Sequence, residues 1–199
     1  MNWVINMVGY PSGKKGLPQN RLKIGTENRG ASLEQDINQT NQYYLDTGKA
    51  NVHKKPTPIQ IVTVDYPKRS AVKITEAYFK TPSTTDYNGV YQGKALDFEA
   101  KETNSKTSFP FSSLHKHQIE HLDSVLKHQA IAFLLVRFVQ YDETYYVEAS
   151  KMIPLYYGKR RSLPYEWFQK EAYLIPYSFI APVNYLAIID RLYFKGESK

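Results

Sequence analysis

The longest apolar run in the sequence is Ala130-Ile131-Ala132-Phe133-Leu134-Leu135-Val136, which ends at Arg137. A strand that is covered on both faces of a sheet has this nearly continuous apolar character. We therefore expect residues 130–140 to form the central strand of the domain, and residues 144–149 to form the next strand after a turn-prone Tyr141-Asp142-Glu143. No apolar run approaches the ~20 residues of a membrane helix, so we expect no membrane partner.

Helical patterns surround this central strand. Ser32 and Gln35 form a capping-box pattern, which predicts the start of a helix. The predicted helices span residues 32–48 and 112–128, with a short one opening at residues 162–164 and a last one after Pro182. Helices that alternate with strands around one sheet make an α/β domain.

Further extended segments lie between the first two helices. Residues 59–64 are β-branched and predict a strand, and residues 71–80 are typical of a returning strand or a short helix. Residues 82–89 are predicted to form a turn because Pro82, Asn88 and Gly89 punctuate them. A strand is then predicted over residues 94–102.

The positive charge of the chain is uneven. Residues 11–29 carry net +4 and residues 49–80 carry net +5, which together exceed the +7 of the whole chain. Such concentration favours a localised anion-binding surface, for a polyanion, a membrane surface or an acidic protein, over basic residues that only maintain solubility. The candidate phosphate contacts are the basic residues Arg29, Lys54, Lys55, Lys68 and Arg69.

The composition also bounds the chemistry and the location. There is no cysteine, which excludes a disulfide, a zinc–thiolate site and a thiol nucleophile and suits a cytoplasmic protein. Residues 1–28 are rich in Gly, Pro, Asn and Lys without a hydrophobic period, so we expect a flexible basic arm before one domain over residues 29–199. Residues 1–8 do not form a secretory signal, and Met7 is the expected natural start.

The candidate chemistry lies around Asp97-Phe98-Glu99-Ala100-Lys101-Glu102. Alternate side chains of a strand share a face, so Glu99 and Lys101 project together while Phe98 and Ala100 point into a core. Asp86 lies thirteen residues before Glu99, and the intervening turn can bring the two carboxylates together. Two carboxylates can hold Mg²⁺, which would activate a water, and Lys101 could offset charge in the transition state. The alternative is a solvated Glu99–Lys101 ion pair with Asp86 as a turn residue.

The helix over residues 112–128 places Gln118 within its apolar arc. A buried amide needs a partner, which is either a hydrolytic water or a backbone carbonyl. Although His117 and His121 have a spacing that permits zinc, phosphate-facing or solvated histidines are favoured over a zinc site. In the first helix Glu34 either points toward the same site or, as we favour, is simply a favourable first-turn charge.

Several segments resemble the RecU family of bacterial Holliday-junction resolvases. They run in order from residue 28 toward the C-terminus and comprise residues 28–30, 53–62, 66–70, 83–89, 97–103 and 117–121. The resemblance implies a single restriction-endonuclease-like domain with a mixed central sheet flanked by helices. It also implies a protruding β stalk over about residues 58–80 that presents Lys68 and Arg69.

The same resemblance implies a Mg²⁺-dependent nuclease, in which Mn²⁺ can substitute, that cuts four-way junction DNA symmetrically. By this similarity Thr84, Asp86, Glu99 and Gln118 match the metal-binding set, and Lys101 matches the lysine that stabilises the transition state. The implied partners are a second copy of the chain, RecA and branch-migration proteins. Two other functions stay open, a sequence-specific restriction-like endonuclease and a non-catalytic DNA-binding or strand-annealing protein.

Overall fold

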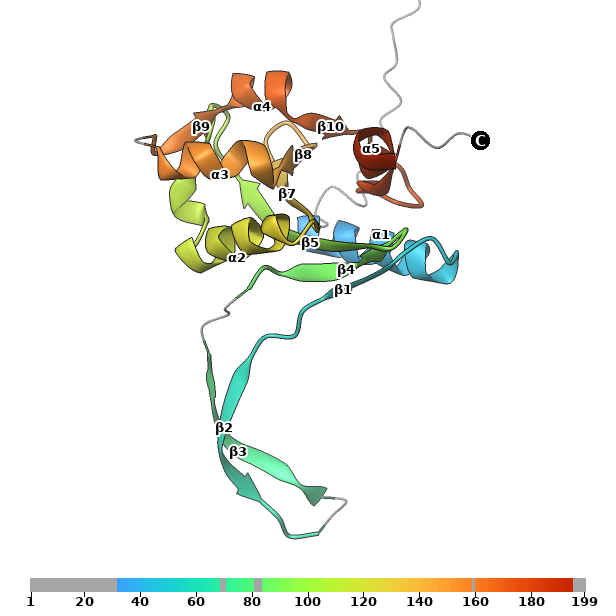
Figure 1. The fold of residues 1–199 in the computed structure, drawn as a ribbon. Coiled ribbons are helices and arrows are strands. Elements are labelled where there is room, and N and C mark those ends of the chain that lie inside the picture. The colour runs from blue at the N-terminus through green and yellow to red at the C-terminus, as the bar shows by residue number, and fades with distance from the viewer. Residues whose placement is uncertain (1–31, 69–70, 81–83, 159, 195–199) are drawn as a thin grey trace, which may run out of the picture. The chain divides into compact units, whose positions relative to one another are not determined.

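A computed structural model describes residues 32–68, 71–80, 84–158 and 160–194 (Figure 1). All of these residues belong to one compact unit. The predicted arm over residues 1–28, the predicted start at Met7, Arg29 and Arg69 lie outside the described residues. None of the helices within the described ranges is both long and apolar enough to cross a membrane.

A six-stranded mixed sheet forms the centre of the domain. Its strand order is β1-β4-β5-β7-β8-β10, and only β5 and β7 are parallel, with Leu96 opposite Ile131 and Thr103 opposite Phe138. Every residue of β7 is buried, which confirms the central strand expected from the apolar run. The strands are β1 (Asn51–Lys54), β4 (Tyr87–Tyr91), β5 (Lys94–Thr103), β7 (Ile131–Phe138), β8 (Glu143–Glu148) and β10 (Tyr173–Ile175).

Helices cover both faces of this sheet. Successive residues of β7 point to opposite faces, so Phe133 joins one core with α1 and α5, while Leu134 joins a second core with α2, α3 and α4. The helices are α1 (Leu33–Asp46), α2 (Lys116–Lys127), α3 (Ala149–Tyr157), α4 (Tyr165–Glu171) and α5 (Leu186–Ile189), with the short turns η3 (Phe111–Ser113) and η4 (Asp190–Phe194). A small sheet pairs β6 (Ser108–Pro110) with β9 (Ser162–Pro164).

A β hairpin forms a separate two-stranded sheet from β2 (Ile59–Asp65) and β3 (Lys73–Phe79), visible as the cyan-to-green pair in Figure 1. All of its residues except the half-buried Val64 are exposed. Residues 71–80 therefore contain a returning strand and not a helix. With this hairpin, the predicted fold class of a mixed sheet flanked by helices is confirmed.

Strand β4 occupies part of the segment that the sequence predicted to be a turn. Asn88 and Gly89 are turn-forming residues, yet they lie inside the ladders with β1 and β5. Glycine is required at position 89 because β1 approaches closely there, and a Cβ would lie 2.3 Å from the carbonyl oxygen of Asn51. The strand therefore depends on its two neighbours and not on local propensity, and β1 was missed for the same reason.

The C-terminal third also differs from the prediction in detail. Residues 162–164 form β9, and the predicted short helix begins directly after it as α4. Helix α3 was not predicted, since Pro154 lies inside it and proline argues against a helix interior. The last helix is confirmed, although α5 begins only at Leu186.

Candidate active site

Strand β5 carries the predicted acid and lysine on one face. Glu99 is fully buried, and its Oε1 lies 2.6 Å from the Nζ of Lys101. Phe98 points the other way and packs in the core beneath α1, against Tyr87 and Phe133. The alternation of the strand thus places a carboxylate and an ammonium group side by side, as the sequence predicts.

Both oxygens of the Glu99 carboxylate accept hydrogen bonds. Oε1 accepts a bond from Gln118 Nε2 at 2.5 Å in addition to the ion pair with Lys101, and Oε2 accepts one from the backbone N–H of Asp86 at 3.1 Å. Burial raises the pKa of Glu99 to about 7, because loss of solvent outweighs the opposing charge of Lys101, and the nearby Asp86 raises it further. A buried carboxylate of this kind favours a proton or another cation at neutral pH.

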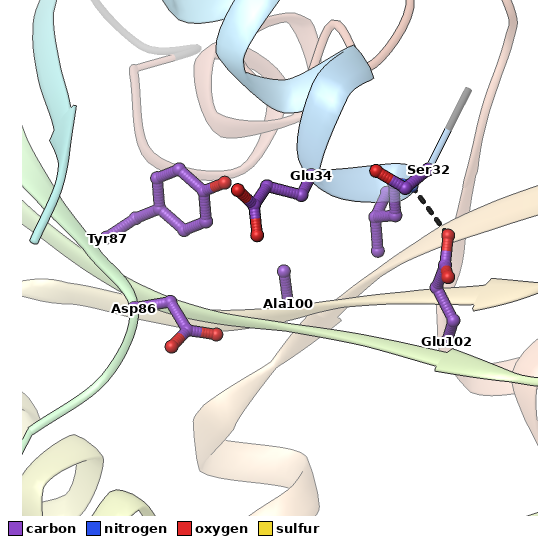
Figure 2. A pocket seen from close by; sticks show the side chains of 7 residues that line it. Ser32, Glu34, Asp86, Tyr87, Ala100 and Glu102 are labelled. Atoms are coloured by element: carbon purple, nitrogen blue, oxygen red, sulfur yellow. Dashed lines mark hydrogen bonds between the residues drawn. The ribbon is translucent and has the colours of Figure 1, made fainter. Parts of the chain in front are cut away.

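Asp86 lies just before β4 and faces a pocket. Its carbonyl oxygen accepts a hydrogen bond from the backbone N–H of Lys55 at 2.7 Å. Figure 2 shows its carboxylate and that of Glu34 on either side of Ala100, within a pocket of about 260 Å³. The remaining lining residues are Ser32, Leu33, Tyr87 and Glu102. The turn before β4 brings the backbone amide of Asp86 to Glu99. Glu99 does not line this pocket, and a joint metal site of the two carboxylates stays a prediction.

Helix α1 brings Glu34 to this pocket. The predicted capping box at Ser32 is present, and the backbone N–H of Leu33 donates to Glu102 Oε1 at 2.6 Å, the dashed line in Figure 2. Glu34 follows in the first turn and pairs with Lys54 at 2.5 Å. Glu34 is a first-turn acid, as we expect from the sequence, and it also lines the pocket, which is the alternative that the sequence left open.

Gln118 is buried near the start of α2, as its place in the apolar arc predicts. Its Oε1 accepts the backbone N–H of His115 at 3.0 Å while its Nε2 donates to Glu99. The side-chain amide of Gln118 therefore finds its partners in the Glu99 carboxylate and the His115 backbone N–H, and not in a backbone carbonyl. To act as a metal ligand, Gln118 would turn its oxygen toward the metal and give up the bond to His115.

A second acid on the same face of β5, Asp97, has partners from three segments. Lys55 Nζ lies 3.1 Å from Asp97 Oδ2 and 3.0 Å from Thr85 Oγ1, and the Thr85 hydroxyl also donates to Asp97. His121 Nε2 lies 3.1 Å from Asp97 Oδ2. This nitrogen nevertheless makes no hydrogen bond within the described part of the chain. Lys55 balances the charge of Asp97.

The candidate DNA contacts occupy different settings. Lys68 is exposed after the end of β2 in the hairpin. Lys54 pairs with Glu34, and the Lys55 side chain is only 20% exposed and bound to Asp97. A role in DNA binding stays a prediction for each of these residues. Thr84 directly precedes the Asp97-bound Thr85, and its hydroxyl donates to the Thr85 carbonyl at 3.4 Å.

The fold and the site define an α/β domain with a buried carboxylate–lysine centre on its central sheet. A family model described as "Recombination protein U" matches residues 28–191, and the chain belongs to this RecU family. "Holliday junction resolvase RecU" of Oceanobacillus iheyensis is 49% identical over 196 residues, which cover 94% of this chain and 100% of the relative. The protein of that name from Geobacillus kaustophilus is 48% identical over 194 residues, which cover 93% and 97%.

A solved structure from Archaeoglobus fulgidus, titled as Hjc, a Holliday junction resolvase, aligns with 64% of this chain and 84% of its own. The sequence identity is 8% and the TM-score is 0.36, a similarity too weak to carry any argument about this chain.

Proposed function

We propose that this protein is a Mg²⁺-dependent endonuclease that resolves four-way DNA junctions by symmetric incision. The observation that carries the proposal is the buried Glu99, bound by Lys101, Gln118 and the backbone of Asp86. This centre occurs in a chain whose relatives are named Holliday junction resolvase RecU. We place its activity in the cytoplasm.

The donor set at the site fits Mg²⁺. Asp86 and Glu99 would supply two carboxylates, and Thr84 would supply a hydroxyl. Gln118 would supply its amide oxygen, which bonds to the His115 N–H in this structure while its Nε2 faces Glu99. Mg²⁺ binds through one or two carboxylates and keeps several waters, so it does not need a cage of acids. Within residues 32–194 as far as they are described, no three His, Asp or Glu side chains gather as a metal site. Mn²⁺ prefers the same oxygen ligands and can substitute.

Each residue has a distinct part in the proposed reaction. A bound Mg²⁺ would polarise the scissile phosphate and lower the pKa of a water molecule that it holds. Asp86 and Glu99 would hold the ion. Lys101, which lies 2.6 Å from Glu99, would orient the attacking water and offset charge that builds up on the phosphate. Glu99 would have to be ionised to serve as a ligand.

We propose that the chain acts as a two-fold homodimer. One site hydrolyses one phosphodiester at a time, so two symmetric cuts need two sites, and closed two-fold symmetry places them. Sedimentation should show a particle near twice 23.1 kDa. A monodisperse monomer that resolves junctions efficiently would contradict this. RecA and branch-migration proteins are the further partners that we propose from family membership.

The direct test is incubation of the protein with a synthetic four-way junction, with and without Mg²⁺. We expect paired nicks on opposing strands only when Mg²⁺ is present. Parallel reactions with duplexes and flaps separate the alternatives. Cutting of plain duplex at one sequence would indicate a restriction-like enzyme, and binding without any cutting would indicate a non-catalytic DNA-binding protein.

The hairpin provides a further prediction. Lys68 lies at its exposed end, where a positive charge can reach the centre of an open junction. Replacing Lys68 and Arg69 with Gln is therefore expected to lower the preference for junction over duplex several-fold, and not only the overall affinity. Gel shifts of both DNAs at one salt concentration measure the preference, with Lys127→Gln on the surface of α2 as a control. An equal loss on both DNAs would reduce these residues to general phosphate contacts.

A further inference from the structure

Asp86 is held in place through its backbone on both sides. Its N–H donates to Glu99 Oε2 at 3.1 Å, and its C=O accepts from the Lys55 N–H at 2.7 Å. The preceding residue, Thr85, is buried, and its hydroxyl bonds to Asp97. The candidate metal ligand is thus attached to a network that extends well beyond the site itself.

Lys55 and Asp97 complete this network. Lys55 Nζ contacts both Asp97 Oδ2, at 3.1 Å, and Thr85 Oγ1, at 3.0 Å. The side chain of Lys55 thus binds Thr85, and its backbone N–H binds the next residue, Asp86. Both partners of the ion pair are largely buried, with side chains 20% and 11% exposed. Removing one partner of a buried ion pair leaves an uncompensated buried charge, so the loss of either Lys55 or Asp97 is expected to disturb the residues around the other.

We infer that Asp97, Lys55 and Thr85 form a clamp that positions Asp86 for metal binding beside Glu99. The inference rests on the proposed function. None of the three residues is itself a ligand in that proposal, so each acts as a positioning residue. Groups that orient metal ligands typically change metal affinity or activity by ~10–100-fold when they are lost.

The clamp also lies at the root of the hairpin. Lys55 is four residues before β2, and Thr85 is six residues after the end of β3. The two ends of the hairpin therefore enter the domain at the clamp. A hairpin that shifts when it engages a junction would act first on the residues that hold Asp86.

Three single substitutions separate a clamp from a simple effect of charge. If Asp97 acted only through its charge, Asp97→Asn would weaken cation binding and Lys55→Met would strengthen it. Thr85→Val, which changes no charge, would then leave binding unaltered. If the three residues act as a clamp, all three substitutions weaken binding, and the Asp97→Asn/Lys55→Met double variant is no weaker than the worse single variant.

The probe is Mn²⁺ alone, titrated into the full-length protein and followed by electron paramagnetic resonance. We expect a roughly tenfold rise in the dissociation constant for each single variant. The matched control is the exposed ion pair of Asp123 and Lys127 on α2, 2.7 Å apart, whose Asn and Met variants should bind Mn²⁺ like the wild type. Tighter binding by Lys55→Met, or unchanged binding by Thr85→Val, would overturn the clamp.

A second readout does not need a metal. Hydrogen exchange of the Asp86 amide, which is bonded to Glu99, should accelerate about tenfold or more in Thr85→Val, while exchange in the buried strand β7 stays unchanged. Unchanged exchange at Asp86, or equal acceleration in β7, would overturn the inference. A wild-type protein that binds Mn²⁺ but does not cut junctions would refute the proposed function alone.

Discussion

Replacing Glu99 with Gln is expected to lower the rate of junction cutting by about a thousandfold, the scale seen when a key electrostatic group of an active site is lost. The glutamine keeps the size of the side chain but removes the charge that holds the cation. Asp86→Asn should have a similar effect. Junction affinity should change by less than about threefold, because phosphate contacts elsewhere dominate binding. Single-turnover cutting and gel shifts on the same junction measure the two quantities.

Two variants bracket this result. Glu120→Gln on α2 makes the same chemical change at an exposed residue and should cut like the wild type. Lys101→Ala should cut poorly yet still bind Mg²⁺, since its charge acts on the transition state. If Glu99→Gln or Asp86→Asn cuts at a near wild-type rate in Mg²⁺, the proposed site is wrong.

Without a metal, ionised Glu99 is expected to destabilise the folded chain. Its pKa rises from 4.5 to about 7 on folding, mainly through burial. The folded state therefore holds the proton more tightly, and stability falls as the pH rises from about 4.5 to 7. A shift of this size corresponds to roughly 3 kcal/mol, an order-of-magnitude figure that applies fully only above the folded pKa.

Glu99→Gln, which stays neutral, should escape this penalty. In EDTA the free energy of unfolding of the variant, relative to the wild type, is expected to rise by roughly 2.5 kcal/mol between pH 5 and pH 8, since a small part of the effect is already lost at pH 5. Urea unfolding at both pH values measures it, and Glu120→Gln provides the surface control. A difference between variant and wild type that does not depend on pH would show that Glu99 is not buried as a charged group. Saturating Mg²⁺ should stabilise the wild type and not the variant.

The sequence by itself determined the features that depend on local pattern. The apolar run ending at Arg137 predicted the central strand, and β7 is buried throughout. The capping box at Ser32 predicted the start of α1. The alternation around Glu99 predicted that it shares a face with Lys101, and the helical period predicted that Gln118 is buried. Each of these follows from the fixed geometry of a single strand or helix.

Only the tertiary structure decided which distant residues meet. Strand β4 exists because β1 and β5 pair with it, although its own residues favour a turn. Glu34 reaches the pocket because Glu102, 69 residues away from Leu33 in the chain, tethers the start of α1. Lys55 turns inward because Asp97 and Thr85 enclose its ammonium group. Periodicity describes the direction of a side chain from its own element, whereas its partner is set by long-range packing, which no local pattern encodes.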